Sequence, residues 1–265
     1  MVKLRLSQQQ LNLFSQCPRK FQQIYLDQLT SPLSVAEEER VAWGDRFHRL
    51  MQQRELCLPI DPLVAEDPQL QQCFNQFLAT ATNLFTPATD SFRVAEHQRV
   101  LKFNQTLLVA VYDLLIATSQ QAQIFDWKTY RHPRDKYQLA QNWQTRLYPY
   151  ILVETSDYCP EQVSMTYWFI QSQENTLPQS LVFPYTTQQH QQTHQDLTQL
   201  LDNLYANLNA YQQGQPFPKV SLESGSCSDC TFALHCQRIP QPAEITASVS
   251  SQNLTDLDNI QEIPI

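Results

Sequence analysis

The chain has 265 residues, of which 42% are hydrophobic, and it carries a formal net charge of −8. This length can bury a core without disulfide bonds, and no apolar run approaches the length of a membrane span. The polar residues at positions 7–10 come soon after Met1–Arg5 and leave no apolar stretch, so we expect no signal peptide and a soluble intracellular protein. The acidic balance argues against tight autonomous binding to nucleic acid, because phosphates are bound by Lys and Arg, but it leaves room for a local basic patch.

The first third of the chain is predicted to be helical. Apolar residues at near-helical spacing predict a helix over 7–29, with Ser7 as its cap, and this stripe consists of Leu11, Phe14, Phe21, Tyr25 and Leu29. Similar patterns predict helices over 35–56 and 67–85.

Strands are predicted to follow. Alternating and β-rich segments predict strands over 92–103, 107–118 and 122–128, the last two joined by a turn at Ser119–Gln121. A helix over 136–155 precedes two more strands, over 162–171 and 180–185, and a long amphipathic helix over 188–213 that Gly214 ends. This order predicts an α/β fold with a mixed sheet flanked by helices.

Two aspartates interrupt otherwise apolar strands. Asp113 lies in AVYDLLI and Asp126 in IFDWKT, where a carboxylate is costly unless it has a partner. In a hairpin that turns about Gln120, positions whose numbers add to about 240 face one another, and the two aspartates add to 239. Cross-strand neighbours lie about 5 Å apart, so these carboxylates can share one Mg²⁺ or Mn²⁺ ion. Lys128 falls on the same sheet face as Asp126, where its ammonium can orient an attacking water or neutralise a phosphate.

These segments resemble motifs of the PD-(D/E)XK nuclease superfamily, and of its RecB/AddB/Cas4 type in particular. The strand pattern Gly-x-x-Asp matches residues 110–113, with Ala in place of Gly, and Asp-x-Lys-Thr matches residues 126–129. The helical pattern Gly-x-x-x-His matches residues 44–48. The resemblance implies a metal site whose ligands are His48, Asp113, Asp126 and the backbone carbonyl of Trp127, with Lys128 assisting the nucleophile.

Three further residues match the family. Gln144 and Tyr148 match a glutamine–tyrosine helix after the catalytic strands, and their spacing places both side chains on one helical face. Apart from the resemblance, this segment is an ordinary amphipathic helix. Glu96 matches a glutamate often found on the preceding strand. The resemblance implies that Gln144 and Tyr148 position DNA, and it makes Glu96 a further catalytic candidate.

Three of the seven cysteines form a C-x₂-C-x₅-C arrangement, namely Cys227, Cys230 and Cys236. Cys17 is the obvious fourth ligand for a metal site, since cysteines in a reducing compartment are thiols or metal ligands. Zinc and a [4Fe–4S] cluster both take four thiolates, and the spacing alone does not separate them. The resemblance favours the cluster, because iron–sulfur members of this nuclease type carry one Cys-Pro before the core and three cysteines after it.

The resemblance spans positions 7–238 and implies one restriction-endonuclease-like domain over 1–238. Within it we expect a helical insertion over 35–90 and an iron–sulfur region made of Cys17 and residues 215–238. The polar, acidic segment 239–265 is predicted to be a poorly ordered tail.

The resemblance also implies an activity, a Mg²⁺- or Mn²⁺-dependent deoxyribonuclease of the prokaryotic cytoplasm. Such enzymes act largely as exonucleases on DNA ends or single strands, with a helicase in DNA repair or in CRISPR adaptation. The alternative is a catalytically inactive module of the same fold that binds DNA or serves as a scaffold, which the acidic charge slightly favours. The complete set of Asp113, Asp126 and Lys128 opposes it, because an inactive site would be free to lose them.

Overall fold

The computed structural model describes residues 4–65, 67–85, 91–130, 135–170 and 177–238. The segment 239–265, expected to be a tail, lies outside these residues. Contacts divide the chain into two compact units, one made of Met1–Gln8 with Ser34–Gln195 and the other of Gln9–Leu33 with Asp196–Ile265. Among the helices that the structure describes, none combines the length and the apolar character needed to cross a membrane.

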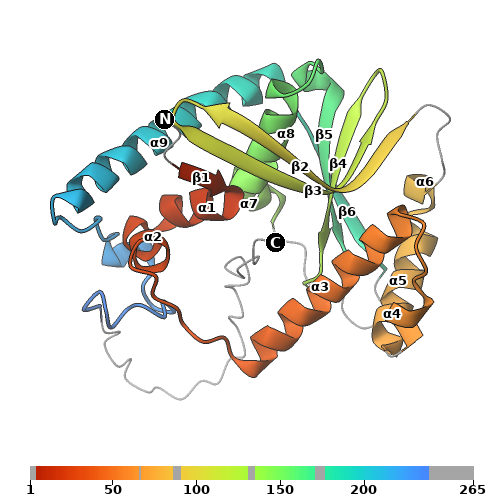
Figure 1. Ribbon diagram of the computed structural model, residues 1–265, viewed down its shortest axis with the longest axis horizontal. Helices are drawn as coiled ribbons and strands as arrows, with labels where there is room; N and C mark the ends of the chain where they lie inside the picture. Colours follow the sequence, from red (N-terminus) through yellow and green to blue (C-terminus); the bar gives the residue numbers. More distant parts are fainter. Residues whose placement is uncertain (1–3, 66, 86–90, 131–134, 171–176, 239–265) are drawn as a thin grey trace. The chain divides into compact units, whose positions relative to one another are not determined.

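A six-stranded sheet forms the centre of the first unit (Figure 1). Its strands are β1 (Leu4–Ser7), β2 (Phe92–Phe103), β3 (Thr106–Ala117), β4 (Ala122–Lys128), β5 (Val163–Phe169) and β6 (Gln179–Pro184). They follow the order β1-β3-β4-β5-β6, and β2 pairs with β3 as well. The pairs β1/β3 and β4/β5 are parallel, and the others are antiparallel. The mixed sheet expected from the sequence is confirmed.

Strand β3 has two partners in succession along one edge, because β2 occupies its other edge. Strand β1 pairs with Thr106 to Val109 of β3, and β4 pairs with Leu114 to Ala117. The β3–β4 register adds to 239, as the hairpin argument predicted, but pairing ends at Leu114 and Phe125. The two strands therefore part at the next position, where Asp113 and Asp126 lie.

Helices of the first unit pack against this sheet. They are α3 (Val35–Glu55), α4 (Asp61–Ala65), α5 (Pro68–Thr80), α6 (Thr82–Phe85), α7 (Lys136–Gln141) and α8 (Trp143–Glu154). An apolar cluster joins α3 and α5 to the sheet through Phe47, Phe77, Leu114 and Trp127. Helix α8 contacts β2, β3 and β5. Since side chains alternate along a strand, Asp126 and Lys128 face away from the cluster that contains Trp127.

Three of the predicted helices are interrupted. The segment 7–29 divides into α1 (Gln8–Gln16) and α2 (Pro18–Tyr25), because Pro18 disfavours a helical conformation for Cys17. Cys17 is extended, with φ −156° and ψ 100°, and caps α2. In the segment 136–155, Asn142 is extended and caps α8 through the backbone N–H of Gln144. The segment 67–85 breaks at Ala81. The short strand β1 was not predicted.

The second unit is built around aromatic rings. It contains residues from α1 and α2, the part of α9 (Thr187–Gln212) after Gln195, and the segment that carries three cysteines. Gly214, with φ 81°, follows α9 as predicted. The ring centroids of Phe14 and Phe21 lie 6.1 Å and 6.2 Å from that of Phe217, which is 1% exposed.

Candidate active site

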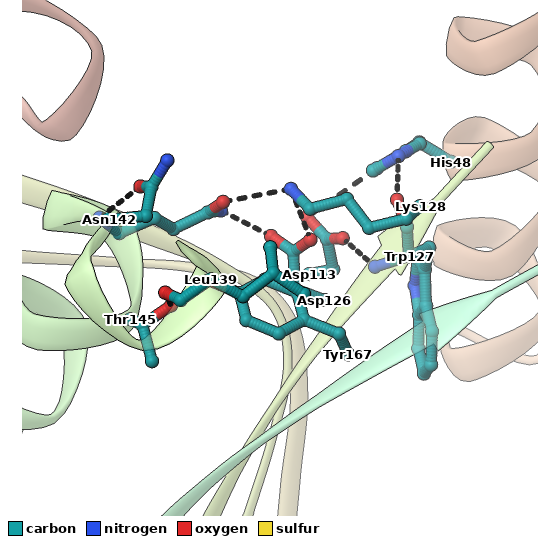
Figure 2. Close-up of polar contacts among 10 residues, drawn as sticks. His48, Asp113, Asp126, Trp127, Lys128, Leu139, Asn142, Thr145 and Tyr167 are labelled. Carbon is teal, nitrogen blue, oxygen red and sulfur yellow. Dashed lines mark hydrogen bonds and ion pairs between the residues drawn. The ribbon is translucent and has the colours of Figure 1, made fainter. Parts of the chain in front are cut away.

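Asp113 lies at the point where β3 and β4 separate (Figure 2). Its Oδ2 accepts a hydrogen bond of 2.6 Å from the backbone N–H of Trp127, in place of a carbonyl of the ladder. The side chain is buried. A carboxylate there leaves Oδ1 directed away from the strand pair and available to a cation or donor.

His48, on α3, contacts one residue of β3 and one residue of β4. Its Nε2 is 3.0 Å from the carbonyl oxygen of Trp127, and its Nδ1 is 3.4 Å from Oδ1 of Asp113. The carbonyl only accepts, so Nε2 carries a proton. Burial lowers the pKa of His48. The carboxylates of Asp113, Asp126 and Glu96 outweigh this effect and raise the pKa to about 10. Near neutral pH the metal-free His48 therefore carries both ring protons, and it must give one up to bind a cation.

Glu96, on β2, lies close to His48 and Asp113 and has an unusual backbone conformation. Its φ is 49°, a left-handed conformation that costs a residue with a side chain about 1–2 kcal/mol. The register of β2 with β3 runs through Ala95 and Leu114, omits Glu96, and resumes at His97 and Tyr112. Strained backbone of this kind is concentrated at functional sites.

The geometry and the donors fit a divalent cation. Among the described residues, His48, Glu96 and Asp113 offer ligand atoms that all lie within 4.8 Å of one another. Ligands on opposite sides of Mg²⁺ are about 4 Å apart, and carboxylate oxygens are the ligands that Mg²⁺ and Mn²⁺ prefer. Glu96, which the sequence made only a catalytic candidate, thus lies among the candidate metal ligands.

The buried Asp126 and the partly buried Lys128 form an ion pair beside this cluster. Nζ of Lys128 lies 2.6 Å from Oδ1 of Asp126, without the alignment of a hydrogen bond. Gln144 joins the two, because its Nε2 donates to Oδ2 of Asp126 and its Oε1 accepts a 2.8 Å bond from Lys128. Burial raises the pKa of the Asp126 carboxyl, and the ammonium opposes this rise. Burial lowers the pKa of Lys128, but the Asp126 carboxylate more than compensates, so Lys128 stays charged.

Tyr148, predicted on the same helical face as Gln144, packs against an aromatic residue of β3. Its side chain is 2% exposed and packs edge-to-face on Tyr112, with ring centroids 5.3 Å apart. The Tyr112 hydroxyl donates to the backbone carbonyl of Tyr148. Tyr148 therefore supports α8 against β3.

Sequence reasoning missed how α8 is held over the site. Thr145 Oγ1 is 2.8 Å from the hydroxyl of Tyr167 on β5, and Asn142 caps the helix immediately before Gln144. The sequence Asn142-Trp143-Gln144 is a capping signal that could have shown where α8 begins.

The four cysteines with predicted ligand roles lie together in the second unit. Cys17, Cys227, Cys230 and Cys236 line one pocket, with the basic side chains Arg19, Lys20, Lys219 and Arg238. Sγ of Cys17 accepts from the backbone N–H of Lys20, and Sγ of Cys236 is 3.6 Å from Nε2 of Gln23. Burial raises the pKa of Cys230, and the thiols of Cys17 and Cys236 raise it as well.

Comparisons with known proteins give a family match and a similar fold. A family model described as the PD-(D/E)XK nuclease superfamily matches residues 5–237. The crystal structure of a "putative exonuclease" from Eubacterium rectale superposes with a TM-score of 0.54 at 10% identity, over 91% of each chain, which supports a shared fold. The structure of the protein SSO0001 aligns with a TM-score of 0.37 at 12% identity, over 89% of this chain and 87% of that one. No curated protein matches the sequence.

Proposed function

Since the chain belongs to the PD-(D/E)XK nuclease superfamily, we propose that it is a deoxyribonuclease that needs a divalent cation to hydrolyse phosphodiester bonds. One observation carries this proposal. The donor cluster of His48, Glu96 and Asp113 lies beside a lysine that is held in its charged form by Asp126 and Gln144. A cation site next to a fixed ammonium is the arrangement that phosphoryl chemistry requires.

We assign the cation to His48, Asp113, Asp126 and the carbonyl of Trp127, and add Glu96 to this set. Mg²⁺ or Mn²⁺ at this site would polarise the phosphate and lower the pKa of a bound water. Asp113 has a second task, because its bond to the Trp127 N–H fixes the carbonyl of the same residue relative to the carboxylate.

Lys128 acts as a cation and not as a base, because its neighbours keep it protonated. Its ammonium can donate to the attacking water or to a non-bridging phosphate oxygen, where charge develops as the P–O bond to the leaving group breaks. Gln144 holds this ammonium on the side of Asp126 and limits its rotation. Gln144 and Tyr148 were expected to position DNA, and we extend the role of Gln144 to positioning Lys128.

By the same resemblance, we propose an exonuclease of the RecB/AddB/Cas4 type that acts in the cytoplasm of a prokaryote. Its substrate would be DNA with a free end, duplex or single-stranded. A helicase in DNA repair, or the proteins of CRISPR adaptation, would supply that end.

The test is cleavage by the purified full chain. With Mn²⁺ or Mg²⁺ we expect linear single-stranded or duplex DNA to be degraded from its ends, and closed circular DNA of the same sequence to be spared. Removing the cation with EDTA should stop the reaction, and adding excess Mn²⁺ should restore it. Absence of cleavage with every substrate and cation, by protein that still binds DNA, would favour the inactive binding module instead.

We propose further that Cys17, Cys227, Cys230 and Cys236 bind a [4Fe–4S] cluster. Their common pocket supports this, and so does its charge, because basic residues and no acidic ones appear among the described residues that line it. Four thiolates on an iron–sulfur cluster carry net negative charge, which this lining compensates.

Zinc is the alternative occupant, because tetrahedral Zn²⁺ also takes four thiolates and the spacing of the cysteines does not separate the two metals. The colour and metal content of the purified protein distinguish them.

Anaerobic purification tests this proposal. We expect brown protein with broad visible absorption and about four irons per chain. Cys17→Ser should lose the iron and lower the melting temperature by several degrees, because the cluster links the two ends of the sequence within one unit. Cys159→Ser, which changes an exposed cysteine outside the pocket, is the matched control and should change neither. Colourless protein containing one zinc per chain would reject the cluster.

A further inference from the structure

Gly44 lies in the interior of α3, where glycine is unfavourable. Glycine destabilises a helix interior by about 1 kcal/mol relative to alanine. A Cβ atom at Gly44 would lie 3.0 Å from Oγ1 of Thr129 and 3.9 Å from its Cβ. The first distance is tighter than nine in ten real Cβ contacts, so with alanine at position 44 either Thr129 or α3 must give way by a few tenths of an ångström.

The same helix face carries His48 one turn further on. Thr129 directly follows β4, two residues after Trp127, whose carbonyl oxygen lies 3.0 Å from Nε2 of His48. Helix α3 therefore contacts the end of β4 at two places on one face. Gly44 approaches Thr129 closely, and His48 makes a polar contact with the Trp127 carbonyl.

We propose that the close approach of Gly44 to Thr129 sets the distance of α3 from the end of β4 and thereby positions His48 for the cation. Gly44 is in this sense a positioning residue, and the proposal rests on the proposed function because it concerns a ligand of that cation site. Metal–ligand distances in proteins agree with their ideal values within about 0.2 Å, so a shift of a few tenths of an ångström that reaches His48 is large enough to disturb its ligation. Changes in the residues that orient metal ligands typically cost 10- to 100-fold in affinity.

The chain provides its own rescue. Replacing Thr129 by alanine removes Oγ1 and leaves its Cβ as the nearest atom, 3.9 Å from an alanine Cβ at position 44, which is ordinary van der Waals contact. The cost of Gly44→Ala should therefore depend on Thr129. A general effect of alanine on the helix would be the same whether or not Thr129 is present.

The experiment is a double-mutant cycle on the full chain, read by the affinity for Mn²⁺ in isothermal titration without DNA. We expect Gly44→Ala to weaken binding about tenfold in the wild-type background and by less than about twofold in the Thr129→Ala background. The melting temperature is the second readout. A contact that is only structural predicts a lower melting temperature with unchanged Mn²⁺ affinity, because the tight approach would cost stability without moving His48. Asp45→Ala, at the exposed neighbouring position, is the control and should not change the affinity.

Each outcome has one meaning. Equal Mn²⁺ affinity of Gly44→Ala and wild type, or an equal loss in both backgrounds, overturns the positioning role and leaves the proposed function standing. If wild type itself binds no Mn²⁺, the proposed function fails, and the inference fails with it. If Gly44→Ala does not fold, the double variant decides, since recovery of folding and of Mn²⁺ binding supports the contact and continued failure rejects it.

Discussion

Asp113→Asn is expected to lower the rate of DNA cleavage on the order of a thousandfold, because a cation site lacking this carboxylate loses several kcal/mol of transition-state stabilisation. The substitution is conservative for the fold. The amide oxygen can still accept the 2.6 Å hydrogen bond from the Trp127 N–H, so the separation of β3 and β4 should persist. The variant therefore tests the charge of Asp113 and not its shape.

Two measurements check this result. The first is the cleavage rate with Mn²⁺, compared with Asp45→Asn, which makes the same chemical change at an exposed position of α3. The second is the titration of His48 by NMR in the metal-free protein. Asp113 raises the pKa of His48, so Asp113→Asn should lower it from about 10. Cleavage within tenfold of wild type would remove Asp113 from the metal site.

Lys128→Met is expected to reduce cleavage 100- to 1000-fold, the effect of removing one preorganised donor to a developing charge. Binding of Mn²⁺ should persist, because the ammonium competes with the cation for Asp126. The contrast between lost cleavage and retained Mn²⁺ binding separates Lys128 from the metal ligands. Unchanged cleavage would exclude the ammonium from the chemistry.

The same variant should shift the pH dependence of Mn²⁺ binding. The Lys128 ammonium lowers the pKa of the buried Asp126 carboxyl, so its removal raises that pKa. A protonated carboxyl cannot bind the cation, and protonation begins at higher pH when the pKa is higher. As the pH falls, Lys128→Met should therefore lose Mn²⁺ affinity before wild type does, which titrations between pH 5 and 8 would show.

The elements that carry Asp113 and Asp126 could be predicted from sequence because their signals are local. Alternation fixes β2, β3 and β4 within one residue, and the short turn fixes the register that brings the aspartates opposite one another. The position of Lys128 follows from the two-residue period of β4. The resemblance to nuclease motifs then added His48, which no local pattern connects to the strands.

Other features of the fold and the site could not be predicted. They depend on tertiary contacts, or on the properties of single residues, which hydrophobic periodicity does not report. Proline at position 18 was present in the sequence, but an apolar stripe across it favoured one long helix over two. The left-handed backbone of Glu96 has no sequence signal, because it arises where β2 and β3 lose a pairing position. The contacts of Gln144 with Asp126 and Lys128 depend on where α8 begins, which Asn142 decides.

The division of the chain into two interleaved units has a consequence for synthesis on the ribosome. Residues 9–33 emerge early, but the rest of their unit, from Asp196 onward, is translated only after residues 34–195. At about 5–20 residues per second, this delay is on the order of ten seconds or more. During that time Phe14 and Phe21 lack Phe217, the ring against which both are packed in the finished protein. The first unit can fold as it emerges, whereas the cysteine-bearing unit can be completed only after Cys236 has been translated.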